Sequence, residues 1–307
     1  MAGVFEGFFT IAALIAAGFV LARVKILDAT AQQVLAHFAF WVASPALLLT
    51  VMARTPVSDV LGPAIATALL SVVVTVTAYL VVARLTWRPG LGDGVIQCLC
   101  AAYVNSGNLG IPIAQYVIGD VKAAAPILLM QLLGFTPIAM ALLDADARGQ
   151  RPSLLVGLGS AVRNPISVCA LAGLVLSVTG IHLPRVVMEP INLLGGMAVP
   201  AMLIAFGISL AVGPGPGRGA PVRQLATLVG FKLVVQPVAA FGIAYAGFGL
   251  RGHALFSALV LASLPTAQNI FVYASHYNRA PVLARDAIFV STLGSAPLIL
   301  GIAVAFH

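Results

Sequence analysis

Two stretches of the chain place amides, hydroxyls and helix-breaking residues inside long apolar runs. Residues 103–113 read YVNSGNLGIPI, and residues 263–277 read SLPTAQNIFVYASHY. Gly and Pro interrupt helices, and a helix broken in a bilayer leaves backbone N–H and C=O groups unpaired. Such a break persists only where protein buries it or where it lines a wet cavity, so these stretches predict a binding site for a substrate or an ion.

The candidate binding residues come from both stretches and from one lysine within an apolar segment. They are Asn105, Ser106, Asn108, Pro112, Pro265, Thr266, Gln268, Asn269 and Lys232. Helix N-termini formed by the breaks attract anions through free N–H groups and the macrodipole. A packing kink is the alternative, because Pro and Gly are common in membrane helices.

The composition requires a membrane around these stretches. Of the 307 residues, 61% are apolar and 8% are charged, and the mean hydropathy is +1.06. A soluble domain carries about 25% charged residues. The net charge of +7 does not indicate nucleic-acid binding, because the basic residues fall singly between apolar runs. We therefore expect lipid, and no nucleic acid, as the surroundings.

Cutting the chain at charges and at Pro/Gly clusters gives about ten segments long enough to cross a bilayer. They are 4–22, 31–52, 60–83, 94–118, 123–143, 164–181, 187–212, 224–247, 253–275 and 284–305. The sequence thus predicts an all-α membrane protein of about ten transmembrane helices.

The basic residues between the segments predict the orientation. Alternate gaps, beginning with the first, hold Arg23, Lys25, Arg84, Arg88, Arg148, Arg151, Arg163, Arg218, Arg223, Arg279 and Arg285. The other gaps hold Arg54, Lys122, Arg185 and Arg251. Because cytoplasmic loops are enriched in Lys and Arg, both termini are expected outside the cytoplasm.

The two halves of the chain resemble each other. SPALLLTVM at 44–52 aligns with VPAMLIAFG at 199–207, and Asn108 aligns with Asn269. We expect a first five-helix repeat at 1–143, a short cytoplasmic linker at 144–163 and a second repeat at 164–307. Since five is odd, the second repeat enters from the opposite side, giving two inverted repeats with broken, crossing helices four and nine.

At these residues the sequence resembles the auxin efflux carrier family, the bacterial relatives of plant PIN carriers in the superfamily of the bile acid–sodium symporters. The matching features are NSGNLGIP, PTAQNIFVYASHY, the Pro-containing second and seventh segments, and Lys232 in FKLVVQP. The resemblance implies a scaffold, a crossing transport unit with an elevator-like movement, and small organic anions such as malonate or auxin as substrates. It also implies an inner membrane of a prokaryote, and by analogy a homodimer.

The coupling ion stays open. Sodium, a proton, or export driven by voltage alone all fit the residues, and no cofactor or metal site is expected. Weak candidates for ion coupling are Glu6, Gln131 and His276. Lys232 is a positive charge near a carboxylate site, a cation that occupies an ion position, or a lysine that snorkels toward the cytoplasm.

Two other classes of protein are less favoured. An enzyme would need a nucleophile or metal motif, and neither H-E-x-x-H nor G-x-S-x-G occurs. An anion channel remains the nearest alternative to a carrier.

Overall fold

The computed structural model describes residues 2–54, 62–110, 113–149, 165–181, 183–213 and 219–306. In this part of the chain the regular structure is helical, apart from one isolated β-bridge. Pro112, the side chains of Glu6 and Asn108, and most of the predicted linker lie outside the described residues.

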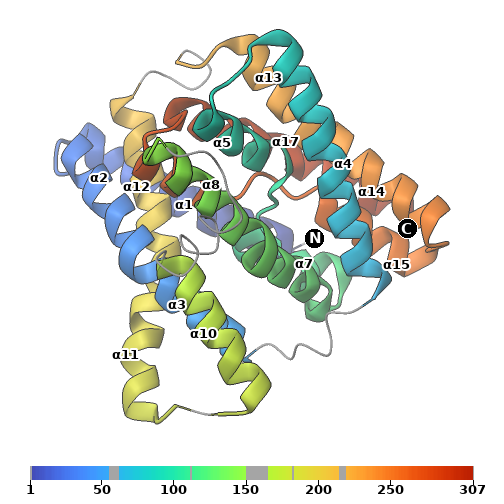
Figure 1. Ribbon diagram of the computed structural model, residues 1–307, viewed down its shortest axis with the longest axis horizontal. Coiled ribbons are helices and arrows are strands. Elements are labelled where there is room, and N and C mark those ends of the chain that lie inside the picture. The colour runs from blue at the N-terminus through green and yellow to red at the C-terminus, as the bar shows by residue number, and fades with distance from the viewer. Residues whose placement is uncertain are drawn as a thin grey trace.

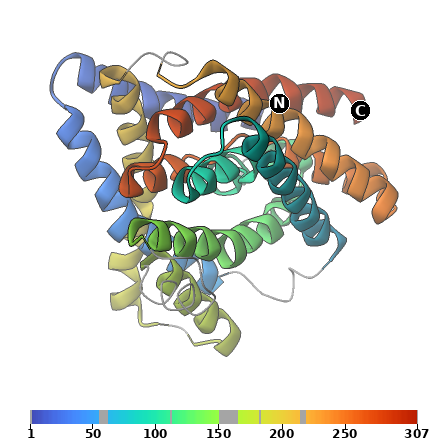
Figure 2. The same ribbon diagram turned by 45° about the horizontal axis from the view of Figure 1, so that its top comes forward.

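The helices pack in two groups that lie side by side (Figures 1 and 2). The first group consists of α1 (Ala2–Arg23), α2 (Ala29–Phe38), η1 (Ala39–Ala43), α3 (Ser44–Arg54), α10 (Pro165–Thr179), α11 (Arg185–Gly196) and α12 (Ala198–Val212). Its main contacts join α1 to α12, α10 and α11 to α3, and α2 to α12.

The second group contains the two predicted broken helices. It consists of α4 (Pro63–Thr86), α5 (Leu91–Ala102), η3 (Ser106–Gly110), η4 (Ala114–Ile118), η5 (Val121–Ala124), α7 (Ala125–Met130), η6 (Gln131–Phe135), α8 (Thr136–Ala147), α13 (Val222–Gly230), η7 (Phe231–Val235), α14 (Gln236–Gly242), η8 (Ile243–Gly247), α15 (Gly252–Ala262), α16 (Asn269–Tyr277) and α17 (Pro281–Phe306). α5 packs against α4, α8, α16 and α17.

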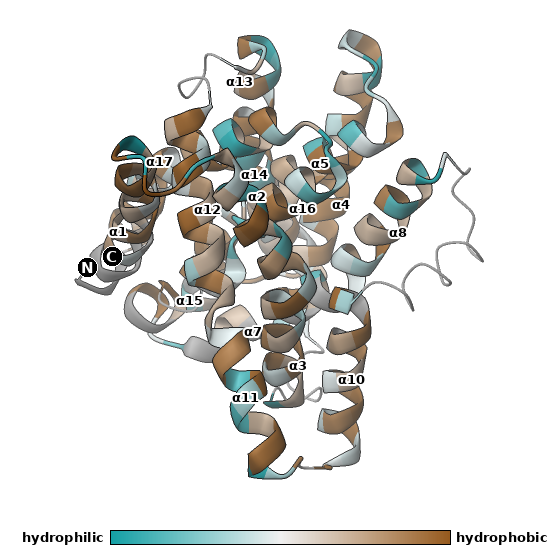
Figure 3. Cartoon of the chain, turned by 90° about the vertical axis from the view of Figure 1, so that its left-hand side faces the viewer, coloured by the Kyte–Doolittle hydropathy of each residue, from teal (hydrophilic) through white to brown (hydrophobic). Residues whose placement is uncertain are grey.

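Five helical stretches of the described chain are long and apolar enough to cross a membrane: Ala29–Arg54, Pro63–Thr86, Arg185–Val212, Val222–Gly247 and Pro281–Phe306. Their outward faces carry exposed apolar side chains such as Leu193, which is 72% exposed. Polar residues gather near the helix ends (Figure 3). This pattern suits a lipid environment, which solvates apolar side chains.

Helix is present within each of the ten predicted segments, and the fourth and ninth are interrupted as expected. α8 extends to Ala147, so the first four residues assigned to the linker are helical. The side chains of Asp144 and Asp146 account for this, because they bind Tyr277 and Arg279 at the end of α16, each at 2.6 Å.

Three π-helical turns are explained by proline. η1, η6 and η7 each end two residues before a proline, at Pro45, Pro137 and Pro237 respectively. Proline has no N–H, and its ring clashes with the carbonyl four residues earlier. A widened turn relieves this clash, and it also rotates the residues of the turn relative to a regular helix.

The first group is held by close backbone contact between α1 and α12. A Cβ added at Gly207 would lie 2.1 Å from the carbonyl oxygen of Ile15, and one at Gly18 would lie 2.3 Å from that of Ile204. Small residues allow such approach in membrane helix pairs.

We therefore expect Gly207→Ala to lower the free energy of unfolding by about 1–3 kcal/mol, because α1 and α12 must separate. Thermal unfolding of the detergent-purified protein measures the loss. Gly230→Ala is the matched control, since no described atom outside its own stretch of helix lies within 4 Å of a Cβ there. Equal unfolding midpoints for the two variants would contradict this account of the contact.

Candidate functional site

The two broken helices cross through a short antiparallel backbone pair. α5 ends at Ala102 and α15 at Ala262, and Val104 forms a β-bridge with Thr266. The N–H of Asn105 donates to Pro265 O at 2.8 Å, and the N–H of Ala267 donates to Tyr103 O at 3.2 Å. Adding 162 to 103 and 105 gives 265 and 267, so each bond is the counterpart of the other in the opposite half of the chain. This offset is one residue more than the 161 that aligned Asn108 with Asn269 in the sequence.

The last carbonyls of the two half-helices are satisfied from outside. In a continuous helix Ala102 O would accept from Ser106 N, but that N–H donates to Val104 O. The amide Nε2 of Gln236 donates to Ala102 O instead, at 2.8 Å. In the same way, the N–H of Thr266 donates to the Ser291 hydroxyl at 3.1 Å, and Lys232 Nζ donates to Ala262 O at 3.3 Å.

Three further contacts fix the crossing from neighbouring segments. The Thr266 hydroxyl donates to Cys100 O at 2.7 Å. Gln131, at the start of η6, donates to Val104 O at 3.0 Å and accepts from the Ser106 hydroxyl. These side chains are at most 2% exposed. The crossing is therefore a buried polar centre in which described groups from several helices satisfy the broken backbone.

A cavity of about 200 Å³ lies beside the crossing, between the two helix groups. The crossing contributes amide and hydroxyl groups of Asn105, Ser106, Gln131 and Asn269, together with Tyr103 and Tyr273. α3 and α12 contribute an apolar wall that includes Leu48, Val51 and Met202. None of the described lining residues is charged.

Asn269 is the first residue of α16, where the helix dipole favours an anion. Its Nδ2 donates to the Tyr273 hydroxyl at 3.0 Å, and its Oδ1 is buried without a hydrogen-bond partner among the described residues. An amide can take either orientation in such a bond, because a tyrosine hydroxyl donates or accepts. Asn269 can thus present either its oxygen or its N–H₂ group to a ligand.

The cavity brings together only part of the predicted site. Pro265, Thr266 and Gln268 do not line it: they are buried behind it, and Gln268 accepts from Asn105 Nδ2 at 2.6 Å. Lys232 is also absent from the lining and is 0% exposed, so the snorkelling interpretation is wrong. Its ammonium group is turned inward, onto the end of α15.

Of the described weak candidates for ion coupling, one lies at the crossing and the other does not. Gln131 lies at the crossing. His276 lies away from the cavity and stacks on Phe40 of η1, with ring centroids 3.9 Å apart. The described residues contain no group of three or more His, Cys, Asp or Glu side chains that could hold a metal ion.

Sequence reasoning missed Gln236, Tyr103 and Tyr273. A signal for Gln236 was present, because it follows Lys232 by four residues and so shares its helix face. The tyrosines gave no signal, since aromatic residues in apolar runs are ordinarily packing residues.

Apolar helices of membrane-crossing length and a broken-helix polar centre define a multi-pass membrane transport protein. The family model described as "Membrane transport protein" matches residues 4–150 and 151–303. The chain belongs to this family, and the resemblance to auxin efflux carriers is confirmed.

The named relatives fall into two sets. The chain is 27% identical over 301 residues to the "Putative malonate transporter" of Rhizobium meliloti (strain 1021), covering 94% of this chain and 91% of the relative. It is 28% identical over 146 residues to "Auxin efflux carrier component 1" of Arabidopsis thaliana and 30% identical over 146 residues to "Auxin efflux carrier component 3a" of rice, Oryza sativa subsp. japonica. Each of these two matches covers 45% of this chain but 23% of the plant carrier.

The crossing makes a prediction for stability. Thr266→Val removes the hydroxyl that donates to Cys100 O without a large change in side-chain volume. Because α5 ends at Ala102, no later turn of that helix supplies another N–H to Cys100 O. We expect a loss of about 1–3 kcal/mol in the free energy of unfolding. Thr227→Val is the matched control: that exposed hydroxyl bonds within its own helix, to Arg223 O, and we expect a change within about 0.5 kcal/mol. Thermal unfolding of both purified variants checks this, and a control as damaging as Thr266→Val would exclude a special role for the crossing.

Proposed function

We propose that this protein is a secondary transporter that carries a small organic carboxylate across the prokaryotic plasma membrane, most simply as an exporter. The observation that carries the proposal is the cavity beside the crossing, where amides of both broken helices face an apolar wall from the other helix group. Membership of the transport family supports the carrier class, and the printed name of the bacterial relative suggests a malonate-like acid.

The geometry of the cavity favours a short substrate. At about 200 Å³ it is smaller than the roughly 300–1,000 Å³ pockets that hold drug-sized ligands. A carboxylate group would meet Asn105, Ser106 and Asn269, and the N-terminal end of α16 would add a favourable dipole. The carbon chain would lie on Leu48, Val51 and Met202. A larger aromatic acid such as auxin would need the cavity to widen.

The transport mechanism we propose is an elevator. The ten segments would form two inverted five-helix repeats, an arrangement that the reciprocal bonds between residues 103–105 and 265–267 support. The second helix group would carry the substrate past the first group, which would act as a scaffold and, in a homodimer, as the interface. Both termini would face outward, as the distribution of basic residues predicts.

Export needs no coupling ion in this scheme. An anion that leaves a cell with a negative interior gains about 2.3 kcal/mol per charge per 100 mV. Sodium- or proton-coupled symport is the alternative, and an anion channel is a second one. A channel would give flux that does not saturate, whereas a carrier saturates and exchanges labelled substrate across the membrane.

The test is the current from proteoliposomes on a solid support, challenged with short mono- and dicarboxylates in sodium and in sodium-free buffer. We expect saturable current for at least one acid. Asn269→Ala should reduce the transport rate about tenfold or more, because a bound carboxylate loses an uncompensated hydrogen bond. Asn192→Ala is the matched control, since that amide bonds to Arg54 far from the crossing.

A current unchanged by Asn269→Ala but saturable would place the substrate elsewhere. Silence in both current and isotope exchange across the panel would overturn the carboxylate assignment.

A further inference from the structure

Lys232 is a buried lysine whose described hydrogen bonds both go to oxygen atoms at or beside the crossing. It lies in η7 and is 0% exposed. Its Nζ donates to Ala262 O, the last carbonyl of α15, and to Oε1 of Gln236. A charge in such a place is costly unless strong acceptors hold it.

Gln236 extends the same arrangement to the other broken helix. Its Oε1 accepts from Lys232, while its Nε2 donates to Ala102 O, the last carbonyl of α5. The free carbonyls at a helix C-terminus carry partial negative charge. One ammonium group, directly and through one amide, therefore faces the negative ends of both half-helices.

In carriers built on broken helices, unwound carbonyls and half-helix C-termini are the places where coupling cations bind. Here a side chain of the protein occupies that place. We infer that the ammonium of Lys232 is a tethered cation that fills the coupling-ion position, so that transport of the anion requires no sodium. The inference rests on the proposed carrier function and names how that site is coupled.

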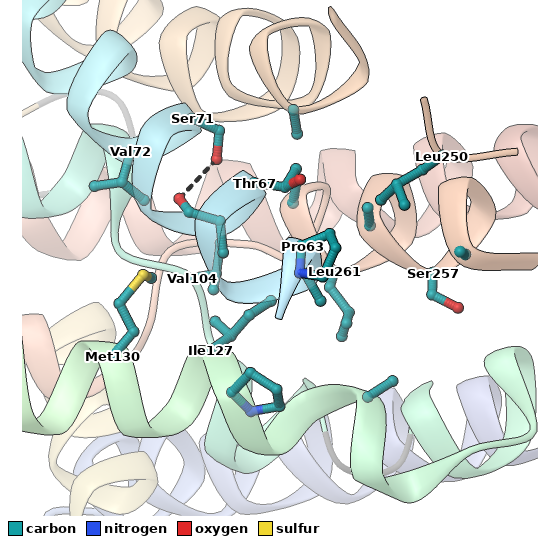
Figure 4. A pocket seen from close by; sticks show the side chains of 18 of the residues that line it. Pro63, Thr67, Ser71, Val72, Val104, Ile127, Met130, Leu250, Ser257 and Leu261 are labelled. Carbon is teal, nitrogen blue, oxygen red and sulfur yellow. Dashed lines mark hydrogen bonds between the residues drawn. The ribbon is translucent and has the colours of Figure 1, made fainter. Parts of the chain in front are cut away.

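A second cavity lies next to this position (Figure 4). It has a volume of about 360 Å³ and lies among α4, α7, α14 and α15, and among the described lining residues it shares Val104 with the cavity beside the crossing. Gln236 and Ala262, the two acceptors of the Lys232 ammonium, belong to its lining. Thr67 also lines it, and its buried hydroxyl has no hydrogen-bond partner among the described residues. A soluble cation that enters here reaches the oxygens that Lys232 would vacate.

The experiment replaces the tethered cation by a free one. Lys232→Ala should reduce transport about tenfold or more, because two oxygen acceptors lose a charged donor. Propylammonium or sodium should restore part of the rate and raise the unfolding temperature of this variant, whereas choline and propanol should do neither. Arg223→Ala is the matched control: it removes an exposed positive charge from the preceding turns of the same membrane segment and should need no rescue.

The wild-type protein provides an independent arm. Its transport and its unfolding temperature should be the same in sodium chloride and in choline chloride. Transport that stops without sodium would overturn the inference. So would a Lys232→Ala variant that responds to no cation, or one that propanol rescues as well as propylammonium does, since the lysine would then only fill space.

Two further comparisons separate a failure of the inference from misfolding of the variant and from a failure of the proposed function. If Lys232→Ala does not fold, Lys232→Arg should retain more transport than Lys232→Met, and equal rates would overturn the inference. If the wild type transports no carboxylate, the proposed function fails, yet the unfolding temperature of Lys232→Ala with and without propylammonium still decides whether the position binds a cation.

Discussion

The structure depends on one constraint: a helix broken inside a bilayer must find partners for the backbone groups that it frees. Each unpaired group costs several kcal/mol in hydrocarbon. The two breaks at Val104 and Thr266 partly satisfy each other through the antiparallel pair. The carbonyls left over are satisfied by Gln131, Gln236 and Lys232, so two other helical segments are fixed by what the crossing lacks.

The positions of those partners follow from prolines. Gln131 and Lys232 lie on π-helical turns that precede Pro137 and Pro237. Because a widened turn rotates its residues, these side chains are directed where a regular helix would not direct them. Prolines that would ordinarily be interpreted as packing kinks thus decide which carbonyls the polar side chains reach. The prolines set the local chain geometry, this geometry fixes the packing of the crossing, and the crossing forms one side of the cavity.

The sequence is sufficient to predict the breaks and insufficient to predict their partners. Clusters of Gly, Pro and amides have a local meaning, which is why 105–112 and 265–269 could be assigned as broken helices from residue types alone. The direction of Lys232 has no local signal. One carbonyl distant in sequence, the amide of Gln236 and one π-turn determine it, so both snorkelling and inward orientation were consistent with a lysine in an apolar run. The same holds for Tyr103 and Tyr273, whose role depends on where α16 crosses.

The separation of charge from the cavity bears on how the proposed carrier would work. The cation at the crossing lies behind the cavity, and the described lining offers neutral amides and hydroxyls only. A cationic side chain in direct contact with a carboxylate would form a strong, charge-assisted pair and would slow release. Neutral donors bind an anion more weakly, and a transported solute must be able both to bind and to leave. By holding its charge on the helix ends, the fold would stabilise the site without trapping the substrate, and the membrane potential would then supply the direction of movement.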